Sequence, residues 1–314
     1  MDIKSLPPRI EPFFPDIFYK TQLCERQAGL PPGLQLTGKV AMITGANALR
    51  SRLGFETSKQ LLALNLSHLI FAVRTPEEGE KAAGQFHIAS PKARIEDFAK
   101  RVDEDLQRLD IVLLNAGLVK PSFQLVKETG HEESMQVNYL STVCLALLLL
   151  PALRNKRASP SQPGKLTIGN SGLSLTGKLP LNSKKPEQPI VKSFDDSAKF
   201  SNTTWYNTSK TLMHMFLWKL SDYVTSEDVV INLVDPGYVK GTEAVSDLPA
   251  ITALMASEFA AVTGRTVEVG ASTFVPYVYK PEGSHAIKPL WEETMNELEF
   301  IKPLAILSEV GTGQ

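Results

Sequence analysis

The sequence predicts an α/β protein built on one parallel sheet that helices cover on both faces. Short apolar runs, continuous rather than alternating, recur at about 39–44, 68–73, 109–115, 165–170, 228–234 and 273–278. Stretches with helical periodicity lie between them, at about 53–65, 92–107, 131–155 and 205–224. Strands that are apolar on both faces are typical of parallel sheets buried between helices.

The chain divides into a proline-rich arm, residues 1–36, and a single domain, residues 37–314. The prolines disfavour regular structure in the arm, and its Phe and Tyr residues favour an arm packed across the domain over a substrate lid. A polar stretch, residues 177–204, indicates an insertion, which we expect over the mouth of the active site.

Composition argues against several kinds of partner. A net charge of −1 gives no electrostatic reason to expect nucleic acid or an acidic membrane surface. The most apolar run, residues 143–150, is too short for a membrane span, which needs about 20 residues. It predicts a buried helix, and a homodimer contact is a second role that it could serve.

The two cysteines, Cys24 and Cys144, suit a reducing compartment, and we expect a cytoplasmic protein. Neither has a histidine at zinc-ligand spacing, so no metal site is predicted. His131 and His214 also lack partners at useful spacing, and we expect structural or exposed roles for both.

Tyr206 and Lys210 provide the clearest chemical signal. Residues four apart lie on one face of a helix, so the lysine ammonium can lie beside the phenol. A free tyrosine has a pKa of about 10, and a nearby positive charge lowers it toward the range useful for proton transfer. Such a pair is common by chance, so its weight depends on the motifs around it.

Those motifs stand in a fixed order. One apolar strand runs into Thr44-Gly45, a second ends in Asn115-Ala116-Gly117, and Asn138 lies in the following long helix. Ser171 follows the next strand, and Pro236 follows the strand after the Tyr/Lys helix. This order resembles the short-chain dehydrogenase/reductase family, and most of all its retinol-dehydrogenase-like reductases of fungal secondary metabolism. The resemblance implies a Rossmann-type doubly wound sheet that binds ligands at the carboxyl ends of its strands.

The resemblance, which covers roughly residues 37–275, also implies roles for matched residues. Tyr206 would protonate the substrate oxygen as hydride arrives, and Lys210 would lower the pKa of Tyr206 and bind the nicotinamide ribose. Ser171 would hold the carbonyl oxygen; Ser174 is an alternative, but Ser171 directly follows the strand. Asn138 would bend its helix and hold a water that leads to Lys210. The residues expected to contact the cofactor are Gly45, Asn47, Leu53, Gly54, Arg74, Asn115, Ala116, Gly117, Tyr206, Lys210, Pro236, Val239 and Thr242.

The end of the second strand predicts which cofactor binds. An acidic residue there would hold the adenosine 2′-hydroxyl of NAD, but the strand leads into Arg74. Because an arginine suits a 2′-phosphate better than a hydroxyl, we expect NADP(H). Cells keep that pool reduced, which favours carbonyl reduction.

The chain departs from the family pattern at the glycine turn. The family has the form T-G-x-x-x-G-x-G, whereas here the middle glycine is absent and extra residues precede Leu53-Gly54. That glycine lets the backbone approach the pyrophosphate. The interval from Arg74 to Asn115 is also short, and it lacks the Asp that ends the family's third strand.

The leading hypothesis is an NADP(H)-dependent oxidoreductase that interconverts a ketone or aldehyde and an alcohol, acting on a small specialised metabolite. A second hypothesis keeps the site without redox chemistry, as a dehydratase, epimerase or cyclase. A third is a binding protein with a decayed nucleotide site. The set Ser171, Tyr206 and Lys210 argues against the third, whereas the altered glycine turn favours the second or third.

Overall fold

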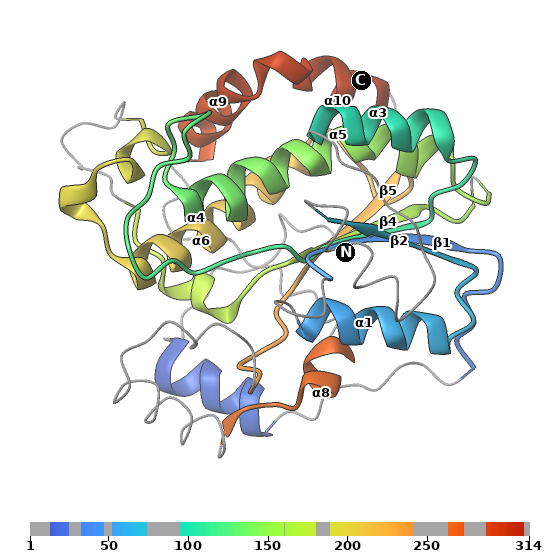
Figure 1. The fold of residues 1–314 in the computed structure, drawn as a ribbon, viewed down its shortest axis with the longest axis horizontal. Coiled ribbons are helices and arrows are strands. Elements are labelled where there is room, and N and C mark those ends of the chain that lie inside the picture. The colour runs from blue at the N-terminus through green and yellow to red at the C-terminus, as the bar shows by residue number, and fades with distance from the viewer. Residues whose placement is uncertain are drawn as a thin grey trace.

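The computed structural model describes residues 13–24, 33–46, 52–73, 95–159, 161–179, 189–240, 263–272 and 287–310. At its centre, five parallel strands lie in the order β2-β1-β3-β4-β5 (Figure 1). They are β1 Val40–Thr44, β2 His68–Ala72, β3 Ile111–Leu114, β4 Gly164–Gly169 and β5 Val229–Val234. The predicted parallel sheet is therefore confirmed, while the sixth strand predicted at 273–278 lies outside the described residues.

Helices cover both faces of this sheet, as predicted. The main ones are α1 Arg52–Ala63, α3 Ile95–Asp105, α5 Thr142–Asn155 and α6 Asn202–Leu220. From β1 the chain passes to β2 in one direction and then to β3, β4 and β5 in the other. Because crossovers between parallel strands are right-handed, α1 lies on one face and α3, α5 and α6 lie on the other (Figure 1). The point of reversal lies between β1 and β3.

Shorter helices complete the layers. Helix α4, Glu133–Met135, continues through a π-helical turn, Gln136–Ser141, into α5. Helix α8, Val267–Ser272, packs beside α1, α9, Ile287–Glu297, packs on α6, and α10, Pro303–Val310, packs on α5. Helices near the C-terminal end of the chain thus pack on helices formed much earlier in the sequence.

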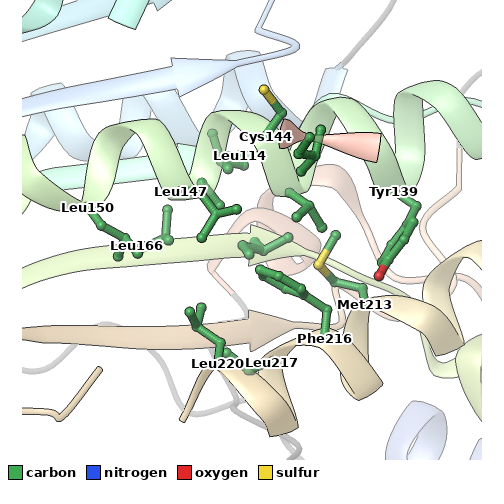
Figure 2. Close-up of a cluster of buried hydrophobic side chains, with 14 of the residues drawn as sticks. Leu114, Tyr139, Cys144, Leu147, Leu150, Leu166, Met213, Phe216, Leu217 and Leu220 are labelled. Atoms are coloured by element: carbon green, nitrogen blue, oxygen red, sulfur yellow. The ribbon is translucent and has the colours of Figure 1, made fainter. Parts of the chain in front are cut away.

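The largest core lies between the sheet and helices α5 and α6 (Figure 2). Leu147 and Leu150 of α5 face Leu166 of β4, and Phe216 and Leu220 approach from α6. All five side chains are buried. The apolar stripe predicted on the Tyr/Lys helix is therefore confirmed as core packing.

The helical run Glu133–Asn155 is long and apolar enough to cross a membrane by length and composition alone. Most of its apolar side chains, including Cys144, are instead buried in the core of the protein. Core helices of globular proteins pass the same test, so the predicted buried helix is confirmed.

The described part of the predicted insertion, 177–179 and 189–204, packs on helices rather than forming only a polar loop. Phe194 is buried, and its carbonyl accepts a hydrogen bond of 2.8 Å from the indole of Trp205. Glu293 of α9 accepts from the backbone N–H groups of Ile190 and Val191 at 2.6 and 3.0 Å. Its placement over the active-site mouth stays a prediction.

Candidate active site

The carboxyl ends of β1 and β3 are joined by one side chain. Thr44, the last residue of β1, accepts hydrogen bonds of 3.0 Å from the backbone N–H groups of Asn115 and Ala116. The amide of Asn115 in turn donates to the carbonyl of Gly45 at 3.1 Å. The Asn-Ala-Gly motif is thereby fixed against the glycine turn, at the reversal point of the sheet, where doubly wound folds bind ligands.

Two glycines allow a close approach of backbone at this point. Gly45 has a φ of +65°, and a Cβ there would lie 2.8 Å from the Cα of Ala116. A Cβ on Gly54 would lie 2.5 Å from the carbonyl oxygen of Gly45. Neither position can hold a side chain, so α1 begins directly against the end of β1 although the middle glycine is absent. Such a strand-to-helix approach suits a pyrophosphate, which the N–H groups at the helix start can bind.

Asn138 lies in the π-helical turn between α4 and α5 and is buried. Its Oδ1 accepts from the backbone N–H of Leu118 at 2.8 Å, and its Nδ2 donates to the Leu118 carbonyl at 2.8 Å. The helix has π-helical hydrogen bonding here, while the predicted bend stays a prediction. The amide itself is engaged by the protein backbone beside Gly117, so its predicted role in holding a water stays a prediction.

Ser171 and Tyr206 meet although 34 residues of sequence lie between them. Ser171 follows β4, and Tyr206 lies in the second turn of α6, where the Ser201 side chain caps the helix by accepting from the N–H of Thr204. The Ser171 side chain lies close enough to the tyrosine hydroxyl to lower its pKa. The structure therefore brings together the two groups predicted to hold the substrate oxygen.

Lys210 lies one helical turn after Tyr206. Its Nζ is 5.8 Å from the centre of the Tyr206 ring and donates to the carbonyl of Gly169 at 2.9 Å. The lysine is buried, and burial lowers its pKa to about 8. Gly117 packs beside it, since a Cβ there would lie 3.5 Å from Nζ. The predicted grouping of Tyr206, Lys210 and Asn138 is present.

The electrostatic effect predicted for this pair differs in the structure. Burial raises the pKa of Tyr206, the neighbouring Ser171 side chain opposes that rise, and the charge of Asp235 adds to it. The prediction considered only the positive charge of Lys210, whereas here desolvation of the phenolate decides the direction. Tyr206 is thus held in its protonated form.

The structure places other predicted cofactor residues around the same edge. Val239 and Leu53 both approach Gly270 of α8, where a Cβ would lie 2.5 Å from Val239 Cγ2 and 3.2 Å from Leu53 Cδ1. Pro236 lies just after β5 and accepts a hydrogen bond of 3.2 Å from Arg265. Asn47, Arg74 and Thr242 lie outside the described residues.

A cavity of about 180 Å³ adjoins Ser171. Its polar lining includes Asn170, Ser174, His214 and Asp235. Of these, only Ser174 was considered as a site residue from sequence, as the alternative to Ser171. His214 is buried and paired with Ser174 at 3.0 Å, which agrees with the structural role expected for it, although its partner lies 40 residues away in sequence. Burial lowers the pKa of His214 to about 3, which leaves the imidazole neutral. Only the position of Asn170 beside Ser171 could have indicated this lining from sequence.

The N-terminal arm forms part of the same cavity wall, through Phe13, Ile17 and Thr21. The prediction that the arm lacks regular structure was wrong for residues 13–24, which form two π-helical turns, Phe13–Ile17 and Lys20–Cys24. The amide of Gln22 donates to the carbonyls of Tyr238 and Thr263 at 2.9 and 2.8 Å. These bonds fix the arm to the segment after β5, beside α8 (Figure 1). The arm thus packs across the domain and also borders the site.

Among the described residues, no group of three or more His, Cys, Asp or Glu side chains could hold a metal ion. Cys144 is buried and Cys24 is exposed.

Comparison with known proteins agrees with this geometry. Residues 39–160 match the family model for short chain dehydrogenases. The chain is 41% identical to the short chain dehydrogenase/reductase mfmJ of Annulohypoxylon moriforme, over 98% of both chains. It is 36% identical to the short chain dehydrogenase virL of Hypocrea virens, over 91% of this chain and 92% of that one. The chain belongs to the short-chain dehydrogenase/reductase family.

Solved structures support the fold. An uncharacterised protein from Mycobacterium paratuberculosis aligns with a TM-score of 0.54 and 20% identity, over 87% of this chain and 98% of that one. The Pseudomonas aeruginosa RhlG/NADP active-site complex aligns with a TM-score of 0.51 and 21% identity, over 82% of this chain and 100% of that one. The predicted Rossmann-type fold and the predicted family are both confirmed.

Proposed function

We propose that this oxidoreductase uses NADP(H) to interconvert a ketone or aldehyde and an alcohol, and that its substrate is a small specialised metabolite. The observation that carries the proposal is that the side chain of Ser171 lies near the phenol of Tyr206, with the buried Lys210 5.8 Å from the centre of the same ring. A carbonyl oxygen held by both hydroxyls would receive its proton from Tyr206. Because the pKa of Tyr206 is raised, the phenol is protonated at neutral pH, which favours reduction.

The described residues fit a dinucleotide. The glycine contacts at Gly45 and Gly54 allow the close backbone approach that a pyrophosphate needs, and α1 begins at that point. Gly117 leaves space beside Lys210, whose ammonium would bind the nicotinamide ribose. When bound, the nicotinamide supplies or accepts the hydride. The preference for NADP(H) depends on Arg74 and is supported by the NADP complex of the structural relative RhlG.

The test is reduction of a panel of ketones and aldehydes with NADPH, using the wild-type protein and Tyr206→Phe. A general acid is typically worth about 10²–10⁴-fold in rate, so the variant should lose that factor while binding NADPH normally. Tyr223→Phe is the matched control, because Tyr223 stacks on Trp291 in the helical layer, 5.2 Å between ring centres. A Tyr206→Phe variant that reduces substrate as fast as this control would overturn the assignment.

A non-redox reaction at the same site is the second candidate, and the altered glycine turn favours it. The two candidates differ in one measurable product. Stoichiometric oxidation of NADPH with substrate supports reduction, whereas substrate conversion that leaves NADPH unchanged supports a dehydratase, epimerase or cyclase.

A further inference from the structure

The cavity beside Ser171 contains one polar side chain that the protein leaves unpaired. Asn170 is 7% exposed and lines the cavity. Neither its Oδ1 nor its Nδ2 has a hydrogen-bond partner among the residues that the structure describes. A buried amide without partners is destabilising, so a ligand that completes its hydrogen bonds is the natural explanation for its presence.

The other polar groups around the cavity are already engaged. Ser174 pairs with His214 at 3.0 Å, and the hydroxyl of Thr21 donates to the carbonyl of Ile17 at 2.8 Å. The carboxylate of Asp235 accepts from the backbone N–H of Gly237 at 2.9 Å and also from that of Gly172. Ser171, which also lines the cavity, accepts from the backbone N–H of Leu173 at 3.2 Å and is assigned to the carbonyl oxygen under the proposed function. Asn170, which can donate and accept at once, is therefore the side chain available to recognise a second polar group of the ligand.

The remaining walls are apolar, and the size of the cavity limits what can enter. Phe13 and Ile17 of the arm face Leu175 and Leu233 of the domain. The volume of about 180 Å³ compares with the roughly 150 Å³ of an apolar cavity that binds benzene. The cavity therefore has room for one six-membered ring with a small substituent. No lysine or arginine is among its described lining residues, and Asp235 disfavours an anion.

We propose that this cavity binds a hydroxylated six-membered ring of the substrate, with the ring between the arm and the domain and the ring hydroxyl on the amide of Asn170. This inference rests on the proposed function, because it is that function which puts the substrate carbonyl at Ser171 and Tyr206. Asn170 and Phe13 are then specificity-determining residues, and the substrate class is an aryl or cyclic carbonyl compound with a ring hydroxyl.

The test uses the ring-hydroxylated acetophenones and their ring-methylated counterparts as probes. Binding is measured by ligand-observed NMR titration with and without NADPH, so that no turnover is needed. The wild-type protein should prefer at least one hydroxyl compound over its methyl counterpart. Asn170→Leu, which keeps the branched shape of the side chain but removes the amide, should reduce that preference by at least about fivefold. Phe13→Ala should instead weaken both members of a pair equally, because it removes only a wall of the cavity.

Asn232→Leu is the matched control. Asn232 lies on β5, paired in register with Thr167, and is not among the residues that line the cavity. The Asn232→Leu variant should keep the wild-type preference for the hydroxyl compound over its methyl counterpart. If Asn170→Leu does not fold, Asn170→Ala removes the amide without adding bulk and serves the same purpose.

An unchanged hydroxyl-to-methyl preference in Asn170→Leu would overturn the proposal. A variant that instead loses affinity for NADPH would also overturn it, because the amide would then serve the cofactor. Both results are independent of the activity assay with Tyr206→Phe. The ring site can therefore fail while the reductase assignment stands, and the reverse also holds.

Discussion

Tyr206 and Lys210 show how burial sets the charge of a catalytic pair. The sequence places an ammonium one helical turn from a phenol, and the structure confirms that proximity at 5.8 Å from the ring centre. Burial raises the pKa of Tyr206 and lowers that of Lys210, so both shifts favour the neutral forms. Spacing along a helix can be read from sequence, but the degree of burial depends on what packs around it.

Lys210→Met should stabilise the protein while removing its activity. The pKa of Lys210 falls to about 8 in the folded protein, against about 10.5 when unfolded, so folding opposes its charged form. The resulting loss of stability is full below pH 8 and disappears as the pH rises through 10.5. We therefore expect a higher Tm for the variant at pH 7, and a smaller gain at pH 10, measured by thermal unfolding.

Lys219→Met is the control for this measurement, since Lys219 lies near the end of the same helix and pairs with Asp222 at 2.8 Å in a more exposed position. It should give no stabilisation at either pH. A gain in Tm for Lys210→Met that does not change between pH 7 and pH 10 would contradict the role of its charge.

Some residues of the site could be predicted from the sequence, whereas others could be found only in the structure. Ser171, Tyr206 and Lys210 could be predicted because each has a fixed place relative to a strand or a helix. The hydrogen bond between Ser174 and His214 could not be predicted, because it joins two elements whose relative position only the tertiary fold determines. The unpaired amide of Asn170 is invisible in sequence for the same reason.

At the scale of elements, most strands and helices were predicted within a few residues. Continuous apolar runs mark β1 and β5, and the amphipathic stripe marks α6, because these elements are buried on the faces that the pattern shows. The arm was harder to predict. Its prolines argue against helix, but Phe13 packs beside Gly172 of the domain, and Gln22 bonds segments more than 200 positions away. Tertiary contacts of this kind override local propensity.

The insertion is tied to two helices through a buried histidine. His131 Nδ1 lies 3.0 Å from Asp195 of the insertion, and its Nε2 lies 3.3 Å from Glu297 of α9. The hydrogen bond to Asp195, which burial partly opposes, raises the pKa of His131 above its ordinary value, and Glu297 adds to this effect. A histidine without a partner at useful spacing in sequence thus has two carboxylates around it.

This arrangement predicts a pH-dependent contribution to stability. Because the folded-state pKa of His131 is raised, its contribution is fully present below its unfolded pKa of about 6.5 and is lost as the pH rises through the folded value. The difference in Tm between the wild-type protein and His131→Gln should therefore be largest near pH 6 and narrow at higher pH. His68→Gln is the control, because His68 is exposed at the start of β2. A difference that widens with pH would show that the histidine is neutral in the folded protein.

At the scale of the whole molecule, the reversal of strand order between β1 and β3 creates the site. The ends of β1, β3, β4 and β5 carry Gly45, Asn115, Ser171 and Pro236, and parallel strands bring all four to one edge. This convergence could be predicted because a doubly wound sheet allows few topologies. The sequence could not predict that the N-terminal arm forms a wall of the cavity, because the arm lies outside the repeating strand-helix pattern.

The choice of cofactor tests the function of the whole molecule most directly. Purified protein should be titrated with NADPH and with NADH while nucleotide fluorescence is followed, using the wild type and Arg74→Ala. We expect NADPH to bind more tightly, and Arg74→Ala to lose roughly 10–150-fold of NADPH affinity with little effect on NADH, since a charge-assisted phosphate contact is worth about 1.5–3 kcal/mol. Equal losses for both nucleotides would contradict the 2′-phosphate contact, and a wild-type protein that binds neither nucleotide would contradict the proposed function itself.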